Sequence, residues 1–292
     1  MKIDKLLREN GCSLSFEFFP PKDTIGETRL FSVVNSLRQF NPTFVSITYG
    51  AGGSSSKNTL HITKRIKEEA SLNPMPHITC VNQSREEVEA MLKNYKSIGV
   101  DNIMALRGDP PLNEQGEPVK PASHFYASDL VKWIKEIGGF SIGVAFYPEG
   151  HVDSKSLDDD IGYAKEKTYA GADFGVTQLF FDNRHYYGLL ERAYRVGINI
   201  PIIASIMPVS NLASLRTLCL RCGASLPTLF ERRLELSVTK EDADKFGIEF
   251  ACRQIDDLLN NGVKYFHFYT MNRSEAILKI IANVGLHRFG IK

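Results

Sequence analysis

The stretch FVSITYGAGGSSSKNTLHITKRIKEEASLNPMPHITCV, residues 44–81, decides the fold class. It starts with an apolar, β-branched run over Phe44–Tyr49 and continues with a segment of helical period over Lys57–Ala70. A second apolar run follows over His77–Val81. A strand, a helix and another strand in this order predict two parallel strands joined by a right-handed crossover.

The same alternation continues through the chain. Apolar runs typical of strands occupy Leu14–Phe19, Phe44–Tyr49, His77–Val81, Asn102–Gly108, Ser141–Pro148, Phe174–Phe181, Ile200–Pro208 and Tyr265–Thr270. Ser84 with Glu87 forms the pattern of a capping box, and Gly99 and Gly171 are placed to end helices. Eight strands that alternate with helices favour a closed (β/α)8 TIM barrel. A doubly wound open sheet remains the alternative, although its G-x-G-x-x-G fingerprint is absent.

Composition indicates a soluble protein, and the length allows one large α/β domain or two small ones; we expect a single domain over residues 1–292. The 292 residues are 43% hydrophobic with a formal net charge of +1, which gives no electrostatic footprint for nucleic acid. No linker divides the chain, and the region Ala224–Asn261 is expected to hold extra helices before the last strand. Met1–Asn10 reads as a short polar helix with Leu6 and Leu7 as its apolar positions. No apolar run is long enough to cross a membrane, so we expect a cytoplasmic protein.

Five scattered cysteines argue against a disulfide framework. Cys219 and Cys222 form a C-x-x-C within a predicted helix, without the further ligands that a zinc site needs. We interpret this pair as packing residues and expect no metal.

The segment SFEFFPP, residues 15–21, places one carboxylate in a run of aromatic residues. Alternation along a strand puts Phe16 and Phe18 on one face and Glu17 on the other. Two prolines then end the pairing. Glu17 is therefore either an exposed carboxylate on an edge strand or an acid at the mouth of a pocket.

Polar residues on other predicted strands or directly after them favour the pocket, because TIM-barrel active sites lie at the carboxyl ends of the strands. They are Thr48, Tyr49, His77, Arg107, Asp109, Tyr147, His151, Gln178 and Arg273. Each also has a structural interpretation: His77 could be a core histidine, and Arg107 could pair with Asp109. Gln178, among apolar residues, must find partners inside the barrel. The set suits a planar cofactor plus one acid.

At these residues the sequence resembles the methylenetetrahydrofolate reductase family. The segments that carry the resemblance are SFEFFPPKD, FVSITYGAGG, PHITC, ALRGDPP, YASDLV, GVAFYPEGH, TQLFFD, MPVSN and FHFYTMNR, in the family's order. The resemblance implies a (β/α)8 barrel that binds FAD, takes hydride from NADH or NADPH and reduces 5,10-methylenetetrahydrofolate to 5-methyltetrahydrofolate. It also implies a homo-oligomer in one-carbon metabolism that supplies methionine synthesis.

The resemblance assigns roles to single residues. Glu17 matches the general acid, Asp109 the carboxylate beside flavin and pterin, and Gln178 the residue that nicotinamide and folate contact in turn. Thr48 matches a nicotinamide contact, and Arg273 a folate contact. The positions that match flavin contacts are Tyr49, Ala51, His77, Arg107, Gly108, Asp109, Tyr126, Ala127, Tyr147, His151, Asp160 and Lys167.

The chain departs from some relatives at four helix positions, Ser214, Leu218, Tyr163 and Glu166. The C-terminal regulatory domain of animal enzymes has no counterpart in this sequence, so we expect no inhibition by S-adenosylmethionine. A pterin-binding barrel methyltransferase without flavin, and a barrel that has lost catalysis, remain rival interpretations.

Overall fold

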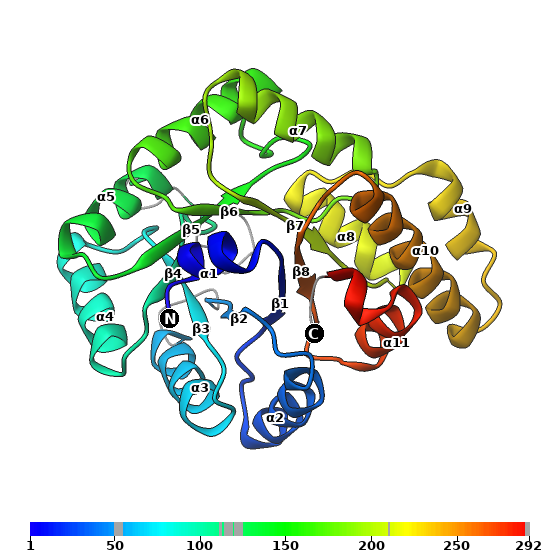
Figure 1. Cartoon of the computed structure of the whole chain (residues 1–292), viewed down its shortest axis with the longest axis horizontal. Coiled ribbons are helices and arrows are strands. Elements are labelled where there is room, and N and C mark those ends of the chain that lie inside the picture. The colour runs from blue at the N-terminus through cyan, green and yellow to red at the C-terminus, as the bar shows by residue number, and fades with distance from the viewer. Residues whose placement is uncertain (50–54, 111–112, 114–118, 120–124, 210, 290–292) are drawn as a thin grey trace.

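Eight parallel strands close into one barrel in chain order, with β8 returning to pair with β1 (Figure 1). This computed structural model describes residues 1–292 except 50–54, 111–112, 114–118, 120–124, 210 and 290–292. The strands are β1 (Ser13–Phe18), β2 (Phe44–Ile47), β3 (Pro74–Thr79), β4 (Asn102–Leu106), β5 (Ser141–Phe146), β6 (Phe174–Thr177), β7 (Ile202–Ile206) and β8 (Tyr265–Tyr269). The predicted TIM barrel is confirmed, and the open sheet is excluded.

A ring of helices covers the outside of the barrel (Figure 1). The helices are α2 (Thr24–Arg38), α3 (Ser55–Glu69), α4 (Arg85–Ser97), α5 (Ala127–Ile137), α6 (Leu157–Tyr169), α7 (Asn183–Arg195), α8 (Leu212–Cys222), α9 (Thr228–Glu235), α10 (Lys240–Asn260) and α11 (Glu275–Val284), and a 3₁₀ turn, η1 (Leu286–Phe289), ends the described chain. The predicted extra helices before β8 are confirmed as α9 and α10. The capping box of Ser84 and Glu87 at the start of α4 is also confirmed.

The barrel has an outer and an inner core. On β1, Phe16 and Phe18 point outward into the large core between strands and helices, as the alternation predicts. Phe44, Met75 and Phe174 belong to the smaller core inside the barrel. This interior is so closely filled that a Cβ at Gly143 on β5 would lie 2.7 Å from the Phe174 ring, so the position requires glycine.

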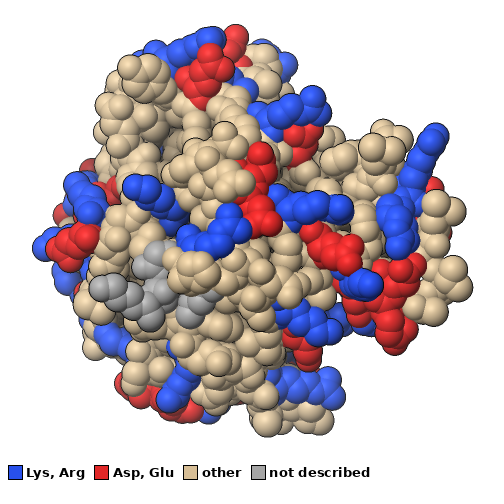
Figure 2. Space-filling model, turned by 45° about the vertical axis from the view of Figure 1, so that its right-hand side comes forward, with Lys and Arg blue, Asp and Glu red and all other residues tan. Residues whose placement is uncertain are grey.

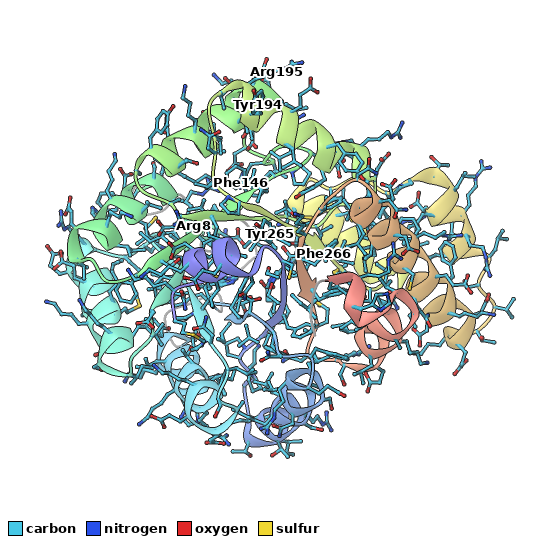
Figure 3. The ribbon with its side chains drawn as sticks, in the orientation of Figure 1. Arg8, Phe146, Tyr194, Arg195, Tyr265 and Phe266 are labelled. Atoms are coloured by element: carbon cyan, nitrogen blue, oxygen red, sulfur yellow. The ribbon has the colours of Figure 1, made fainter. Side chains whose placement is uncertain are left out.

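Helix α1 (Ile3–Asn10) closes the amino-terminal end of the barrel. Ile3 and Leu7 are its buried residues, and Leu6 is half-buried. The side-chain oxygen of Asn102 accepts the Ile3 N–H at 2.8 Å. Tyr265 donates to the Leu7 carbonyl at 3.3 Å and lies beside this helix in Figure 3. A ligand must therefore reach the interior from the carboxyl ends of the strands.

Three predicted strand boundaries are corrected. His77 does not open a strand but is the fourth residue of β3. Gln178 does not lie inside a strand but directly follows β6, and Phe19 follows β1 with 37% of its surface exposed. The Gln178 N–H still donates to the Phe146 carbonyl at 2.7 Å, yet its side-chain oxygen turns back to accept the Leu179 N–H. Regular pairing ends at this point because the chain turns into the loop above the barrel.

Charged side chains of both signs are interspersed on the face that Figure 2 presents. None of the described helices is both long and apolar enough to span a membrane.

Candidate active site

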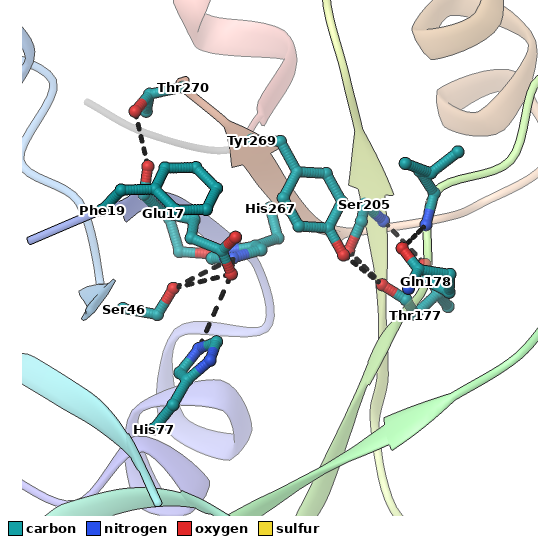
Figure 4. Close-up of polar contacts among 12 residues, drawn as sticks. Glu17, Phe19, Ser46, His77, Thr177, Gln178, Ser205, His267, Tyr269 and Thr270 are labelled. Carbon is teal, nitrogen blue, oxygen red and sulfur yellow. Dashed lines mark hydrogen bonds and ion pairs between the residues drawn. The ribbon is translucent and has the colours of Figure 1, made fainter. Parts of the chain in front are cut away.

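Glu17 lies inside the barrel near its carboxyl end and is only 7% exposed. Its Oε2 atom lies 3.3 Å from Ser46 Oγ, 3.6 Å from His77 Nε2 and 3.7 Å from His267 Nε2 (Figure 4). The barrel register creates this group, since Glu17 pairs with Ser46 on β2 and with Tyr269 on β8. We call Glu17, Ser46, His77, His267 and Tyr269 the inner cluster. The interpretation of Glu17 as an exposed edge-strand carboxylate is therefore wrong.

Burial fixes the charge state of two inner-cluster members. Removal from water lowers the pKa of His77, and nearby His267 lowers it further, although Glu17 acts in the opposite direction. Burial together with the Glu17 charge raises the pKa of Tyr269 well above its usual range. At neutral pH His77 is thus a neutral imidazole, and Tyr269 keeps its proton and donates it to the Thr177 carbonyl at 3.1 Å.

A second group of side chains lies beyond the ends of β4 and β5. Arg107 bonds to Asp153 at 2.8 Å, so its suggested pairing with Asp109 was wrong. The backbone N–H of Asp153 donates to His151 Nδ1 at 3.0 Å, and the backbone N–H of His151 donates to Asp160 at 3.0 Å. The Tyr147 ring meets the His151 ring edge to face at 4.8 Å. We call Arg107, Tyr147, His151, Asp153, Asp160 and Lys167 the outer cluster.

Lys167 is a half-buried cation of the outer cluster. Its ammonium donates to the Ala145 carbonyl at 2.5 Å and lies 5.7 Å from the centre of the Tyr147 ring. Desolvation lowers the pKa of Lys167 to about 8, although the charge of Asp160 acts to raise it. Burial and the Arg107 charge likewise lower the pKa of His151. The Lys167 ammonium is therefore a cation that solvent stabilises poorly, which makes it a suitable partner for an anionic ligand.

The two clusters are connected through Gln178. Tyr147 of the outer cluster and Gln178 line one narrow pocket, which Gly150 and Cys222 also border. Gln178 directly follows Thr177, whose carbonyl accepts the Tyr269 hydroxyl. Gln178 thus lies between the Tyr147 side of the outer cluster and the Tyr269 side of the inner cluster.

A strained turn follows β8 and carries Arg273. Met271 and Asn272 both have positive φ, 49° and 53°, which is unfavourable for residues other than glycine. The turn is held because Asn272 exchanges two hydrogen bonds with the Phe19 backbone, at 2.9 and 2.8 Å. Thr270 also donates to the Glu17 carbonyl at 2.5 Å. This turn fixes the end of β8 to the end of β1 and leaves Arg273 exposed.

Other predicted site residues are spread around the mouth of the barrel. Asp109 is exposed, and in the described part of the chain its carboxylate makes no hydrogen bond or ion pair. Gly108 has a φ of +89°, and a Cβ there would lie 2.6 Å from the Val81 side chain. Tyr126 and Ala127 form the start of α5.

Three predicted site residues follow β2. Thr48 is half-buried, and its N–H donates to the Phe18 carbonyl at 3.0 Å. The Tyr49 hydroxyl accepts from Gln83 at 3.0 Å. Ala51 lies outside the described residues.

Sequence reasoning missed Ser46 and His267, and it assigned no role to Tyr269 at the end of the last predicted strand. The alternation of side chains along each strand did contain a signal, because each of these residues lies an even number of positions from other inward-facing residues of its strand. The pairing register that brings them to Glu17 was not readable from any single segment.

Cys219 and Cys222 lie on α8, where Cys219 is buried and Cys222 half-buried. Burial raises the pKa of Cys219 to about 12, which keeps the thiol protonated. In the described part of the chain, no group of three or more His, Cys, Asp or Glu residues is arranged to hold a metal ion.

Comparison with known proteins gives one consistent family. A family model described as methylenetetrahydrofolate reductase matches residues 2–285. The 5,10-methylenetetrahydrofolate reductase of Pectobacterium carotovorum is 38% identical over 275 residues, which cover 94% of this chain and 90% of that protein. That of Escherichia coli K12 is 36% identical, with coverage of 94% and 91%.

A plant relative, methylenetetrahydrofolate reductase (NADH) 1 of Arabidopsis thaliana, is 35% identical, and the match covers 98% of this chain but 50% of the plant protein. Among solved structures, an uncharacterized Clostridium thermocellum protein that binds two copies of 5-methyl-5,6,7,8-tetrahydrofolic acid has a TM-score of 0.69. It is 14% identical, and the match covers 98% of each chain, so the likeness concerns the fold.

Proposed function

The chain belongs to the methylenetetrahydrofolate reductase family and reduces 5,10-methylenetetrahydrofolate to 5-methyltetrahydrofolate; we propose that it does so with FAD at the mouth of the barrel and Glu17 as the acid. The observation that carries this proposal is the burial of Glu17 among two histidines and a serine at the end of the barrel that ligands can reach. NADH or NADPH is the proposed electron donor.

The outer cluster suits the phosphate-bearing part of FAD. Arg107 and Lys167 supply positive charge close to the aromatic ring of Tyr147, and Gly108 brings backbone close to Val81 with no side chain in between. The backbone amide and side-chain groups around His151 are already fixed by Asp153 and Asp160, so little ordering is needed on binding. When bound, FAD accepts a hydride from the nicotinamide and passes it to the folate.

Glu17 would act on the folate. The five-membered ring of methylenetetrahydrofolate must open to a reactive iminium, and a positioned acid assists that step by protonating the departing nitrogen. Glu17 is suited to this task because it is buried, reachable only from the strand ends, and held by Ser46. His77, a neutral imidazole at neutral pH, does not compete with Glu17 for the role of acid.

Three further residues would complete the site. Asp109 would stabilise the cationic iminium electrostatically, Gln178 would contact nicotinamide and folate in turn, and Arg273 would bind the folate. Gln178 has a side-chain nitrogen to offer, because its oxygen already accepts the Leu179 N–H. A cytoplasmic location and a homo-oligomeric state complete the proposal.

The identity of the cofactor is the direct test. We expect the purified protein to be yellow and to release FAD on heating, which mass spectrometry identifies. FMN, or an absence of flavin after reconstitution attempts, would contradict the proposal and favour a pterin-binding barrel that needs no flavin.

A further inference from the structure

A series of hydrogen-bonded side chains leads from Glu17 into the barrel and ends at the backbone carbonyl of Phe266. We call this series the hydrogen-bond chain. Ser46 Oγ lies 3.3 Å from both Glu17 Oε2 and His267 Nε2. On the opposite edge of the ring, His267 Nδ1 lies 2.8 Å from Ser15 Oγ. Ser15 Oγ in turn donates to the Phe266 carbonyl at 3.0 Å. Ser15 and Ser46 are fully buried, and His267 is 1% exposed, so water does not compete for these contacts.

The end of this chain fixes the tautomer of His267. Ser15 has one hydroxyl proton, which it donates to the Phe266 carbonyl. With that proton in use, Ser15 Oγ is an acceptor for His267, an arrangement that places the ring proton on Nδ1. In the neutral ring, Nε2 is then a bare acceptor that faces Ser46 and Glu17. Stacking of the ring on Phe44, with centroids 5.6 Å apart, holds this orientation.

The two protonation states of Glu17 differ in how many donors and acceptors of the hydrogen-bond chain find a partner. When Glu17 is protonated, it can donate to Ser46, Ser46 to His267 Nε2, His267 Nδ1 to Ser15, and Ser15 to the Phe266 carbonyl. Each donor then has an acceptor, and every hydrogen bond points the same way. When Glu17 is ionised, Ser46 turns its proton to the carboxylate, and Nε2 of His267 is left buried and unsatisfied.

The hydrogen-bond chain does not lead to solvent on the far side of the barrel. Below it lie Phe44, Met75 and Phe174 of the inner core, closed off by Ile3 and Leu7 of α1. Protons do not pass through an apolar layer, so the hydrogen-bond chain supports Glu17 and does not relay protons from the other end of the barrel.

We propose that His267 is a positioning residue that favours the protonated form of Glu17 through Ser46, and that Ser15 sets its tautomer. The inference rests on the acid role proposed for Glu17 but concerns a group that the substrate does not touch. The other titratable groups that face Glu17 are His77 from β3 and Tyr269 from β8. Tyr269 is committed to the Thr177 carbonyl, so it does not supply the missing donor or acceptor.

Nitrogen-15 NMR of the histidine-labelled holoenzyme tests the tautomer directly. The chain contains seven histidines, and the signal missing from a His267→Gln variant identifies the relevant ring. We expect a protonated Nδ1 and a bare Nε2 at neutral pH. A proton on Nε2, or a doubly protonated ring, would overturn the proposal independently of any rate measurement.

Ser15→Ala tests the consequence for the reaction, with Ser13→Ala as its matched control. Ser13 lies on the same strand and face and is 1% exposed, and in the described part of the chain its hydroxyl has no hydrogen-bond partner. Ser15→Ala should slow flavin reoxidation by methylenetetrahydrofolate about tenfold, the size expected for one lost hydrogen bond. It should leave flavin reduction by the nicotinamide unchanged.

The pH profile separates the proposed role from a packing defect. In Ser15→Ala, His267 is no longer held in one tautomer, so the decline of the reoxidation rate with rising pH should begin at lower pH than in the parent. Ser13→Ala should keep the parent profile. If both variants give the same rates and profile, Ser15 and His267 are only packing residues and the inference is wrong. If Glu17→Gln reoxidises normally, the acid role itself fails, whatever tautomer the NMR spectrum shows.

Discussion

Replacement of Lys167 by Met should stabilise the flavin-depleted protein while weakening its affinity for FAD. Lys167 is a half-buried lysine whose ammonium donates to the neutral Ala145 carbonyl at 2.5 Å. Burial lowers the pKa of Lys167 from 10.5 to about 8. At ~1.4 kcal/mol per pKa unit, this burial costs roughly 3 kcal/mol at neutral pH. Loss of the hydrogen bond costs the variant about 1 kcal/mol, so its free energy of unfolding should exceed that of the parent by roughly 2 kcal/mol.

The pH dependence gives the sign of this effect. Because the pKa of Lys167 is lower in the folded chain, the unfolded chain binds more protons between about pH 8 and pH 10.5. The free energy of unfolding of the parent must therefore rise over that window, relative to the variant. Below pH 8 the full penalty is present, and the stability difference between variant and parent should be constant.

Urea denaturation of the two flavin-depleted proteins at pH 7 and pH 10 measures the difference. Lys165→Met is the control, because Lys165 lies over the exposed Tyr169 ring on the same helix and its removal should change stability by less than ~0.5 kcal/mol. Affinity for FAD should fall about tenfold or more in Lys167→Met only. A Lys167→Met protein that is less stable than the parent at pH 7 would refute the reasoning, since the ammonium would then be well solvated.

Two further changes test the outer parts of the site. Asp109→Asn should raise the midpoint potential of the flavin and slow folate reduction. If Asp109 lies beside the flavin as proposed, its charge would contribute ~1–4 kcal/mol at a separation of ~4 Å and effective dielectrics between water and a protein surface. An unchanged or lower midpoint potential in a spectroelectrochemical titration would show that Asp109 does not lie close to the flavin ring. Replacement of Cys219 and Cys222 by Ser should retain turnover, because both thiols are at least half-buried on α8 and burial raises the pKa of each. A loss of turnover with normal flavin content would show that the pair takes part in the reaction.

The fold could be predicted from the sequence because local sequence patterns indicate the order of its strands and helices. The alternation of apolar runs and helical segments predicted eight strands, and Ser84 with Glu87 predicted the start of α4 to the residue. Strand ends were less predictable. Gln178 sits in a continuous apolar run, yet pairing stops at Thr177 because the chain turns above the barrel, which depends on the neighbouring strands.

The site could be predicted only in part, for a related physical reason. Glu17 was recognisable because it interrupts an aromatic run. Ser46 and His267 become its neighbours only through the register in which β1 pairs with β2 and β8. Register depends on closure of the whole barrel, so two ordinary residues in separate segments carried no visible sign of their contact with Glu17.

The central claim is that Glu17 supplies a proton to the folate, and stopped-flow measurement of both half-reactions in Glu17→Gln tests it most directly. Glutamine keeps the shape and the contact with Ser46 but has no acidic proton to give. Flavin reduction by the nicotinamide should stay near the parent rate. Reoxidation by methylenetetrahydrofolate should fall by roughly 10²–10⁴, the contribution typical of a positioned acid. Equal slowing of both half-reactions, or normal rates in both, would contradict the acid role.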